Sequence, residues 1–250
     1  MNVVLINKHD KLFELNSTES IACCADESMA SDRSSVDLTA GDETNHSTPV
    51  AVEMPDDLYS TAEGGDVSAQ IKLACLCGEA NGEPEDYDEA FRYHRKAADQ
   101  GDRNAQFSVG FMYLEGLGVR RNYKEAFQWF LLAAEKGESS AQANLGWLYE
   151  NGFGVPQNDA EAVRWYREAA LNEDPYAALS LGLVYSRGRC QPTDPDAAYI
   201  WISIAAWNGV PEAEDKQEKL EQTMTPDQIS MAWRRAKACI SSRFKDCACI

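Results

Sequence analysis

The sequence predicts an all-α protein built as a solenoid of stacked helix hairpins. Three observations support this fold class: similar residues recur every 36 positions, apolar residues within each copy are spaced three and four apart, and glycines separate the apolar blocks. Spacings of three and four place side chains on one face of a helix. A hairpin of this size cannot bury its apolar face alone, so we expect consecutive copies to stack.

An alanine marks the first helix of each copy, and a small residue follows it five positions later. The small residue predicts a close approach by a neighbouring helix, because a larger side chain would hold the two backbones apart. The marker alanines are Ala69, Ala105, Ala141, Ala177 and Ala213, and the small residues are Ala74, Gly110, Gly146 and Gly182.

A second block predicts the second helix of each hairpin, with an aromatic residue three positions after an alanine. Glycines between the blocks and after the second block supply the positive φ angles that helix-ending turns need. The alanines are Ala90, Ala126, Ala162 and Ala198, the aromatic residues are Tyr93, Trp129, Trp165 and Trp201, and the glycines are Gly101, Gly116, Gly118, Gly137, Gly152, Gly154 and Gly209.

The combined pattern is A-x-x-x-L-G-x-x-Y, then G-x-G-V, then A-x-x-W-Y/F with a following Ala-Ala pair. It closely resembles the Sel1-like repeat family, relatives of tetratricopeptide repeats, and the resemblance covers residues 69 to 212 as four units. This resemblance implies a right-handed α-solenoid and a non-enzymatic protein-interaction scaffold. Residues 61 to 68 echo residues 133 to 140, two 36-residue periods further along the chain, so we expect a half unit before the first full one.

The pattern divides the chain into four parts. The first part is rich in acidic residues, Ser and Thr, and we expect it to be disordered because it has too little apolar surface to bury. Within residues 1 to 57, twelve side chains are acidic and three are basic. The parts are an acidic leader (1–54), the repeats (55–212, with units starting near 69, 105, 141 and 177), C-terminal capping helices (213–245) and a tail (246–250).

The last helix has a strong start signal. Thr225 is a good cap, Pro226 suits the first helical position, and Gln228 stands at the capping-box position. We expect this helix to run to about residue 240 and to cover the open end of the solenoid with a stripe formed by Ile229, Trp233, Ala236 and Ile240. Its basic residues, including Arg234, Arg235 and Lys237, are better explained as a solvated face than as a membrane contact.

Charge and targeting signals narrow the function classes. The net charge of −18 would repel phosphate backbones, so nucleic acid is not an expected partner. Residues 1 to 10 do not form a signal peptide, and no segment is long and apolar enough to span a membrane. We therefore expect a cytoplasmic protein whose eight cysteines are reduced thiols.

No pattern in the sequence indicates catalysis, a metal or a cofactor. His94 occupies the position of Phe130, Tyr166 and Ile202 in the later copies, so we expect a packed helix residue. Cys75 and Cys77 likewise fall on apolar repeat positions, which favours small buried hydrophobes over a metal site. The Gly-x-Gly pairs lack a preceding strand and a phosphate-loop lysine, so they are turns. The sequence therefore does not predict an enzyme.

A partner-binding groove follows from the family resemblance. In tetratricopeptide repeats the first helix of each hairpin lines the concave face, and transferring its inward positions predicts an apolar groove with a few polar contacts, suited to an extended or helical peptide. The alternative is that these side chains are inter-helix core. The predicted partner-binding residues are Phe107, Phe111, Leu114, Ala143, Trp147, Glu150, Asn151, Tyr176, Leu179, Leu183 and Arg187.

The terminus Cys247-Ala248-Cys249-Ile250 fits the C-a-a-X prenylation box loosely. Nearby basic residues and Cys239 would supply the second signal that stable anchoring requires. The alternative is an exposed thiol tail. The motif defines a competing hypothesis to the adaptor: a bacterial effector that is translocated into a host cell and held at its membranes by a lipid on Cys247. Membrane contact is expected only in that case.

Overall fold

The computed structural model describes residues 56–80, 84–188 and 193–242. These ranges contain eleven α-helices and no strand, which confirms the predicted all-α solenoid of helix hairpins. None of these helices is long and apolar enough to cross a membrane. The C-a-a-X tail, the loop after residue 188 and the leader lie outside the described residues.

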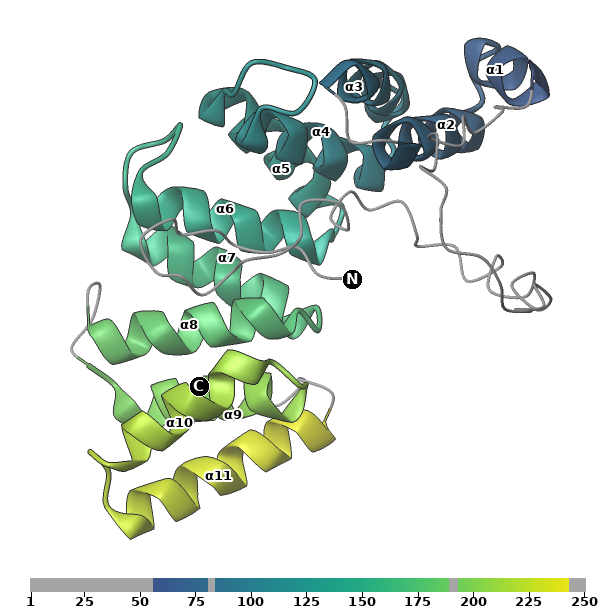
Figure 1. Cartoon of the computed structure of the whole chain (residues 1–250). Helices are drawn as coiled ribbons and strands as arrows, with labels where there is room; N and C mark the ends of the chain where they lie inside the picture. Colours follow the sequence, from purple (N-terminus) through teal and green to yellow (C-terminus); the bar gives the residue numbers. More distant parts are fainter. Residues whose placement is uncertain (1–55, 81–83, 189–192, 243–250) are drawn as a thin grey trace, which may run out of the picture.

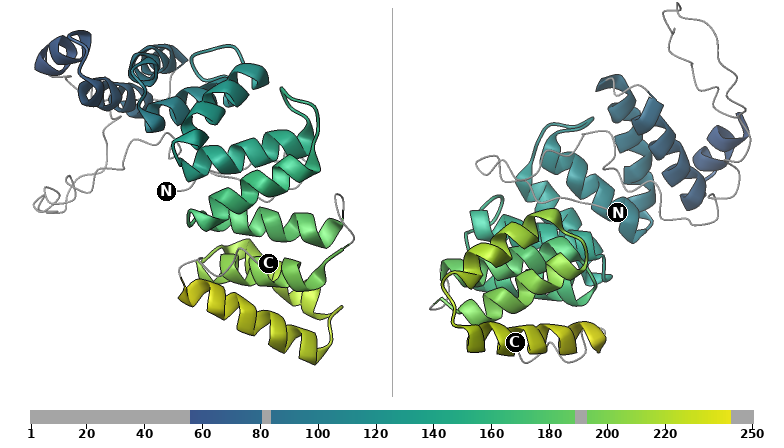
Figure 2. Two further views of the ribbon diagram at one scale, coloured as in Figure 1. Left: turned by 180° about the vertical axis from the view of Figure 1, so that it is seen from behind. Right: turned by 60° about the horizontal axis from the view of Figure 1, so that its bottom comes forward.

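The helices stack in chain order along a curved arc, in two layers (Figures 1 and 2). They are α1 (Asp56–Glu63), α2 (Val67–Ala80), α3 (Pro84–Asp99), α4 (Arg103–Glu115), α5 (Tyr123–Glu135), α6 (Ser139–Asn151), α7 (Asp159–Leu171), α8 (Pro175–Arg187), α9 (Pro195–Trp207), α10 (Pro211–Glu221) and α11 (Pro226–Ser241).

Four antiparallel hairpins form the body of the arc. Helix α2 pairs with α3, α4 with α5, α6 with α7, and α8 with α9, and the second helix of each pair packs against the first helix of the next. Helix α1 packs on α2 as the predicted half unit. The loop glycines adopt positive φ angles, for example 79° at Gly116 and 70° at Gly152, as the turns require.

The glycine at the small-residue position of α4, α6 and α8 makes room for a ring or branched side chain of its partner helix. A Cβ added to Gly146 would lie 2.6 Å from the ring of Tyr166, and one added to Gly110 would lie 2.7 Å from Phe130. The predicted close approach is therefore confirmed, and its cause is a side chain that fills the space above the glycine. This contact sets the spacing within the hairpin.

The glutamine of the recurring Ala-Gln pair links consecutive units. The Gln106 side chain donates to the carbonyl of Ala98 at 3.2 Å, and Gln142 donates to the carbonyl of Ala134 at 3.2 Å. Both acceptors lie at the end of the preceding second helix, where carbonyls lack intrahelical partners. A buried amide therefore fixes each unit against its neighbour.

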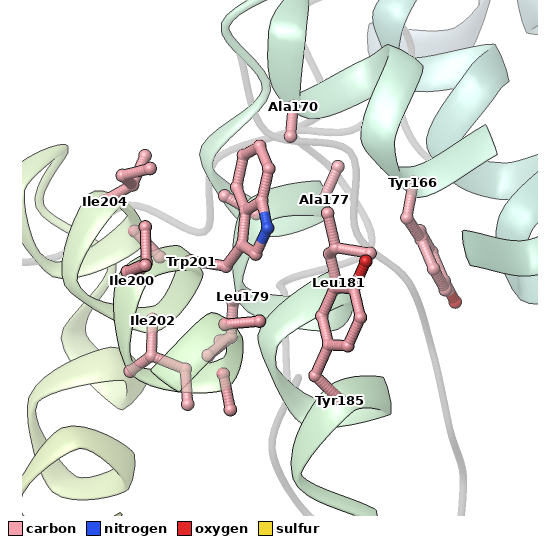
Figure 3. Close-up of a cluster of buried hydrophobic side chains, with 14 of the residues drawn as sticks. Tyr166, Ala170, Ala177, Leu179, Leu181, Tyr185, Ile200, Trp201, Ile202 and Ile204 are labelled. Carbon is pink, nitrogen blue, oxygen red and sulfur yellow. The ribbon is translucent and has the colours of Figure 1, made fainter. Parts of the chain in front are cut away.

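The hydrophobic core is continuous along the C-terminal half of the arc. Trp201 in α9 is fully buried, and Figure 3 shows its indole pointing toward Ala170 and Ala177 of the two preceding helices. Ile200 and Ile202 flank it on the same helix. Helix α9 is therefore the centre of this part of the core.

The C-terminal helix begins as predicted but packs differently. Thr225 and Gln228 form a complete capping box at the start of α11. The side chains that α11 buries are Ala232, Ala236 and Cys239, whereas Trp233 is 38% exposed, so the predicted stripe is wrong at Trp233. Small residues permit a close contact with α9, which α11 covers.

Helix α10 ends the repeating pattern. It packs on α9 as the first helix of a fifth unit would, but α11 covers α9 as well and does not form a hairpin with α10. The repeat positions that are Leu181 and Tyr185 in α8 are Gln217 and Glu221 in α10. Gln217 donates to the Tyr199 hydroxyl at 3.0 Å, and that hydroxyl donates to Glu221 at 2.7 Å. These polar contacts replace the apolar face on which a further helix would pack.

Two cysteines depart from the predicted reduced state. Cys75 and Cys239 are disulfide-bonded. Cys75, Cys77 and Cys239 are buried, as their apolar repeat positions or helix face require. Because Cys239 is 1% exposed and already bonded, it is not available as the second lipidation site that the sequence suggested.

Candidate partner-binding face

The predicted partner-binding residues lie on the first helices α4, α6 and α8, and the structure divides them into two groups. The first group is buried between helices. Phe107, Phe111 and Leu114 belong to the core around α4 and α5, and Ala143 and Leu179 belong to the core around α7 to α9. These five residues therefore belong to the core between the helices, which is the alternative that the sequence also allowed.

The second group is partly exposed and apolar. Trp147, Tyr176 and Leu183 are half-buried, and all three pack one side against the C-terminal core. Trp147 also touches the core around α4 and α5, so it lies where two units meet. Its ring centroid is 5.1 Å from that of Phe153, which is 36% exposed in the loop that follows α6.

Charged and polar side chains border these apolar residues. Glu150 on α6 accepts a hydrogen bond from Arg187 on α8 at 2.9 Å and another from the Tyr166 hydroxyl at 2.9 Å. The Glu150 side chain is 12% exposed and that of Arg187 is 42% exposed, so the guanidinium faces solvent while the carboxylate is covered. Asn151 donates to the carbonyl of Trp147 at 2.9 Å.

This network joins neighbouring units across the face. Burial raises the pKa of Tyr166 well above its usual value, and the Glu150 carboxylate raises it further. The phenol therefore stays protonated and keeps donating to Glu150. Sequence reasoning did not find this role, because Tyr166 occupies a position that packs against a glycine and no local pattern shows where its hydroxyl points.

Titratable groups elsewhere do not form a reactive constellation among the described residues. His94 is 1% exposed, and burial lowers its pKa to about 4, so its imidazole is neutral at pH 7. Within the described ranges, no three His, Cys, Asp or Glu side chains gather in a way that could hold a metal ion.

Stacked 36-residue helix hairpins define an α-solenoid repeat protein. The Sel1 repeat model matches residues 67–102, 103–138, 139–174 and 175–209, which together exceed half of the chain. The chain belongs to the Sel1 repeat family.

Two solved structures extend this comparison. A protective antigen of uropathogenic Escherichia coli strains, described as having an SLR fold, is 30% identical over 75% of this chain, with a TM-score of 0.69. A Sel1 repeat protein from Oxalobacter formigenes is 30% identical over 73% of this chain and 77% of its own, with a TM-score of 0.59. This chain spans 41% of the length of the E. coli antigen. No curated protein matches the sequence.

Proposed function

We propose that this protein is a non-enzymatic adaptor that holds a protein partner on the face formed by α6 and α8. Sel1 repeat proteins are generally protein-interaction scaffolds, which supports the class. The observation that carries the proposal is the group Trp147, Tyr176 and Leu183, which are half-buried on α6 and α8 and pack against the same core cluster, with Asn151 and Arg187 on the same two helices.

Such a face has the composition of a peptide-binding surface. Large apolar side chains held rigidly by a core act as anchors, because they lose little conformational freedom when a partner covers them. Polar side chains beside them can pair with the backbone or side chains of an extended or helical peptide. Trp147 is held from below by two core clusters, so it is already oriented before binding.

The test is affinity capture with the full chain, compared with two alanine variants. We expect Trp147→Ala to weaken the captured partner at least about fivefold, the loss expected for a hot-spot residue. Leu132→Ala is the matched control, because Leu132 is 43% exposed on α5 and lies outside the proposed face. Melting temperatures are measured for all three proteins.

The outcomes separate binding from folding. Loss of the partner in Trp147→Ala with a melting temperature close to the wild type supports the proposal. A fall in melting temperature with full capture would show that Trp147 is only core. Equal loss of the partner in both variants would place the binding surface elsewhere.

The prenylated-effector alternative depends on Cys247, which lies outside the described residues, and no described feature favours it over the adaptor. The compartment is a separate matter. The sequence predicts the cytoplasm, and no helix in the described ranges is long and apolar enough to cross a membrane.

A further inference from the structure

The outward side of α11 is a basic surface on an acidic protein. Residues 228 to 241 of this helix hold three basic side chains and no acidic one, although the whole chain carries a net charge of −18. Arg234 and Lys237 are exposed on this side of the helix. Because α11 lies at the end of the arc, this side faces away from the repeats (Figure 2).

Basic side chains in the hairpins mostly pair with carboxylates of their own or neighbouring helices. Arg164 lies 2.9 Å from Glu161, for example, and Lys96 lies 2.8 Å from Glu63. In contrast, neither Arg234 nor Lys237 forms an ion pair with any residue in the described ranges. The positive charge of this surface is therefore not compensated by the folded repeats.

Apolar side chains share this helix with the cations. Met231 is 61% exposed and Trp233 is 38% exposed, so both are among the most exposed large apolar residues of the described chain. A helix that only caps the solenoid needs no exposed Trp or Met beside its lysine and arginine. The combination suits an occupant that carries both acidic and apolar side chains.

We propose that residues 19–37 of the same chain dock on this surface of α11, defined by Met231, Trp233, Arg234 and Lys237. Residues 19–37 hold five acidic side chains and one basic one, interleaved with apolar residues such as Ile21 and Val36. This charge is complementary to the surface. The proposal is independent of the α6 and α8 face.

Chain length permits the contact. The 18 residues between residue 37 and α1 can extend to at most about 65 Å. Packed helix layers lie about 10 Å apart, so the stack from α1 to α11 spans roughly 60 Å. Tethering gives the segment an effective concentration in the millimolar range, so a surface with few charges suffices. An anionic membrane lacks this advantage and would be repelled by the rest of the acidic chain.

Zero-length carbodiimide cross-linking of the full chain tests the proposal. The Lys237 amine should become linked to carboxylates of residues 19–37, as located by peptide mass spectrometry. We expect at least a fivefold loss of this link in Arg234→Glu and in about 0.5 M salt, which screens surface charges. Arg120→Glu is the matched control, because Arg120 is exposed outside α11 and should leave the link unchanged.

An equal mixture of 15N-labelled and unlabelled protein identifies the occupant. Links that join two peptides of the same label show docking within one chain. Mixed-label links would show that a second copy occupies the surface, and would overturn the proposal. It is also overturned if Lys237 forms no link to residues 19–37, or if wild-type protein without that link sediments with phosphatidylserine vesicles and Arg234→Glu does not.

Discussion

His94 is the side chain that fits its surroundings least well. It lies in α3 at the repeat position that Phe130, Tyr166 and Ile202 occupy in later units, and it is 1% exposed. Neither ring nitrogen has a hydrogen-bond partner among the described residues. A buried polar group without a partner costs stability, because the bonds that it made with water in the unfolded chain are lost.

We therefore predict that His94→Leu stabilises the protein and removes part of its acid sensitivity. At pH 7 the gain should be about 1–3 kcal/mol, from two buried nitrogens without partners. Burial lowers the pKa of His94 to about 4, against 6.5 for an ordinary histidine. The unfolded chain thus binds a proton throughout that range while the folded chain does not, so the wild type loses roughly 3 kcal/mol as pH falls from 6.5 to 4.

Urea unfolding of both proteins at pH 7 and pH 4.5 checks this. The gap in unfolding free energy between variant and wild type should widen at the lower pH. Asp174 acts in the opposite direction, because burial raises its pKa to about 6 and the folded state binds its proton first. It is present in both proteins and cancels in the comparison. An identical gap at both pH values would contradict the burial argument.

Helix α6, the first helix of the third unit, lacks the side-chain N-cap that α4 and α8, the first helices of the second and fourth units, have. Asp102 accepts from the Ala105 amide at 2.8 Å and Asp174 accepts from the Ala177 amide at 2.8 Å. Glu138 stands at the same position before α6 and makes no such bond. Glutamate has one more methylene than aspartate, so the Glu138 carboxylate does not lie beside the backbone amide that an aspartate at this position would reach.

We predict that Glu138→Asp raises the unfolding free energy by about 0.5–1 kcal/mol, the usual gain from a side-chain cap. The lost contact to Arg103, at 3.8 Å and largely solvent-exposed on the arginine side, offsets little of this. Asp102→Glu is the reciprocal control and should lower stability by a similar amount. Thermal melts of both variants that match the wild type would show that these caps do not limit helix stability.

Local patterns account for the elements that the sequence could predict. The capping box at Thr225 and the positive φ of Gly116 depend on a few adjacent residues, so they are readable from the sequence. Which side of a helix meets which neighbour depends on the whole arrangement. The α11 stripe was therefore wrong at Trp233 even though the start of that helix was right.

The candidate face shows the same limit at the scale of the whole molecule. The repeat register correctly places Trp147 and Leu183 at equivalent positions of neighbouring first helices. The register does not show how deeply each side chain is buried. Phe107 and Leu179, which were predicted to bind a partner, are buried in the core. The contact between Glu150 and Arg187 joins two units and has no signature within either one.

The packing of α11 on α9 predicts how a change in the last helix affects the stability of the whole solenoid. Ala236 is completely buried, whereas Ala238 on the same helix is exposed. Ala236→Gln would force a longer polar side chain into the contact with α9 and should lower the unfolding free energy by about 2–3 kcal/mol. Ala238→Gln adds the same group on the solvent side and should stay within about 0.5 kcal/mol of the wild type.

Hydrogen exchange shows how far that change travels. In a repeat protein each unit contacts only its neighbours, so opening at one end need not reach the other. We expect faster amide exchange in α9 and α11 of Ala236→Gln and unchanged exchange in α4 to α6. Equal acceleration along all the helices would mean that the solenoid unfolds as one cooperative body and that α11 stabilises every unit, because a local cap cannot speed exchange in units that it does not touch.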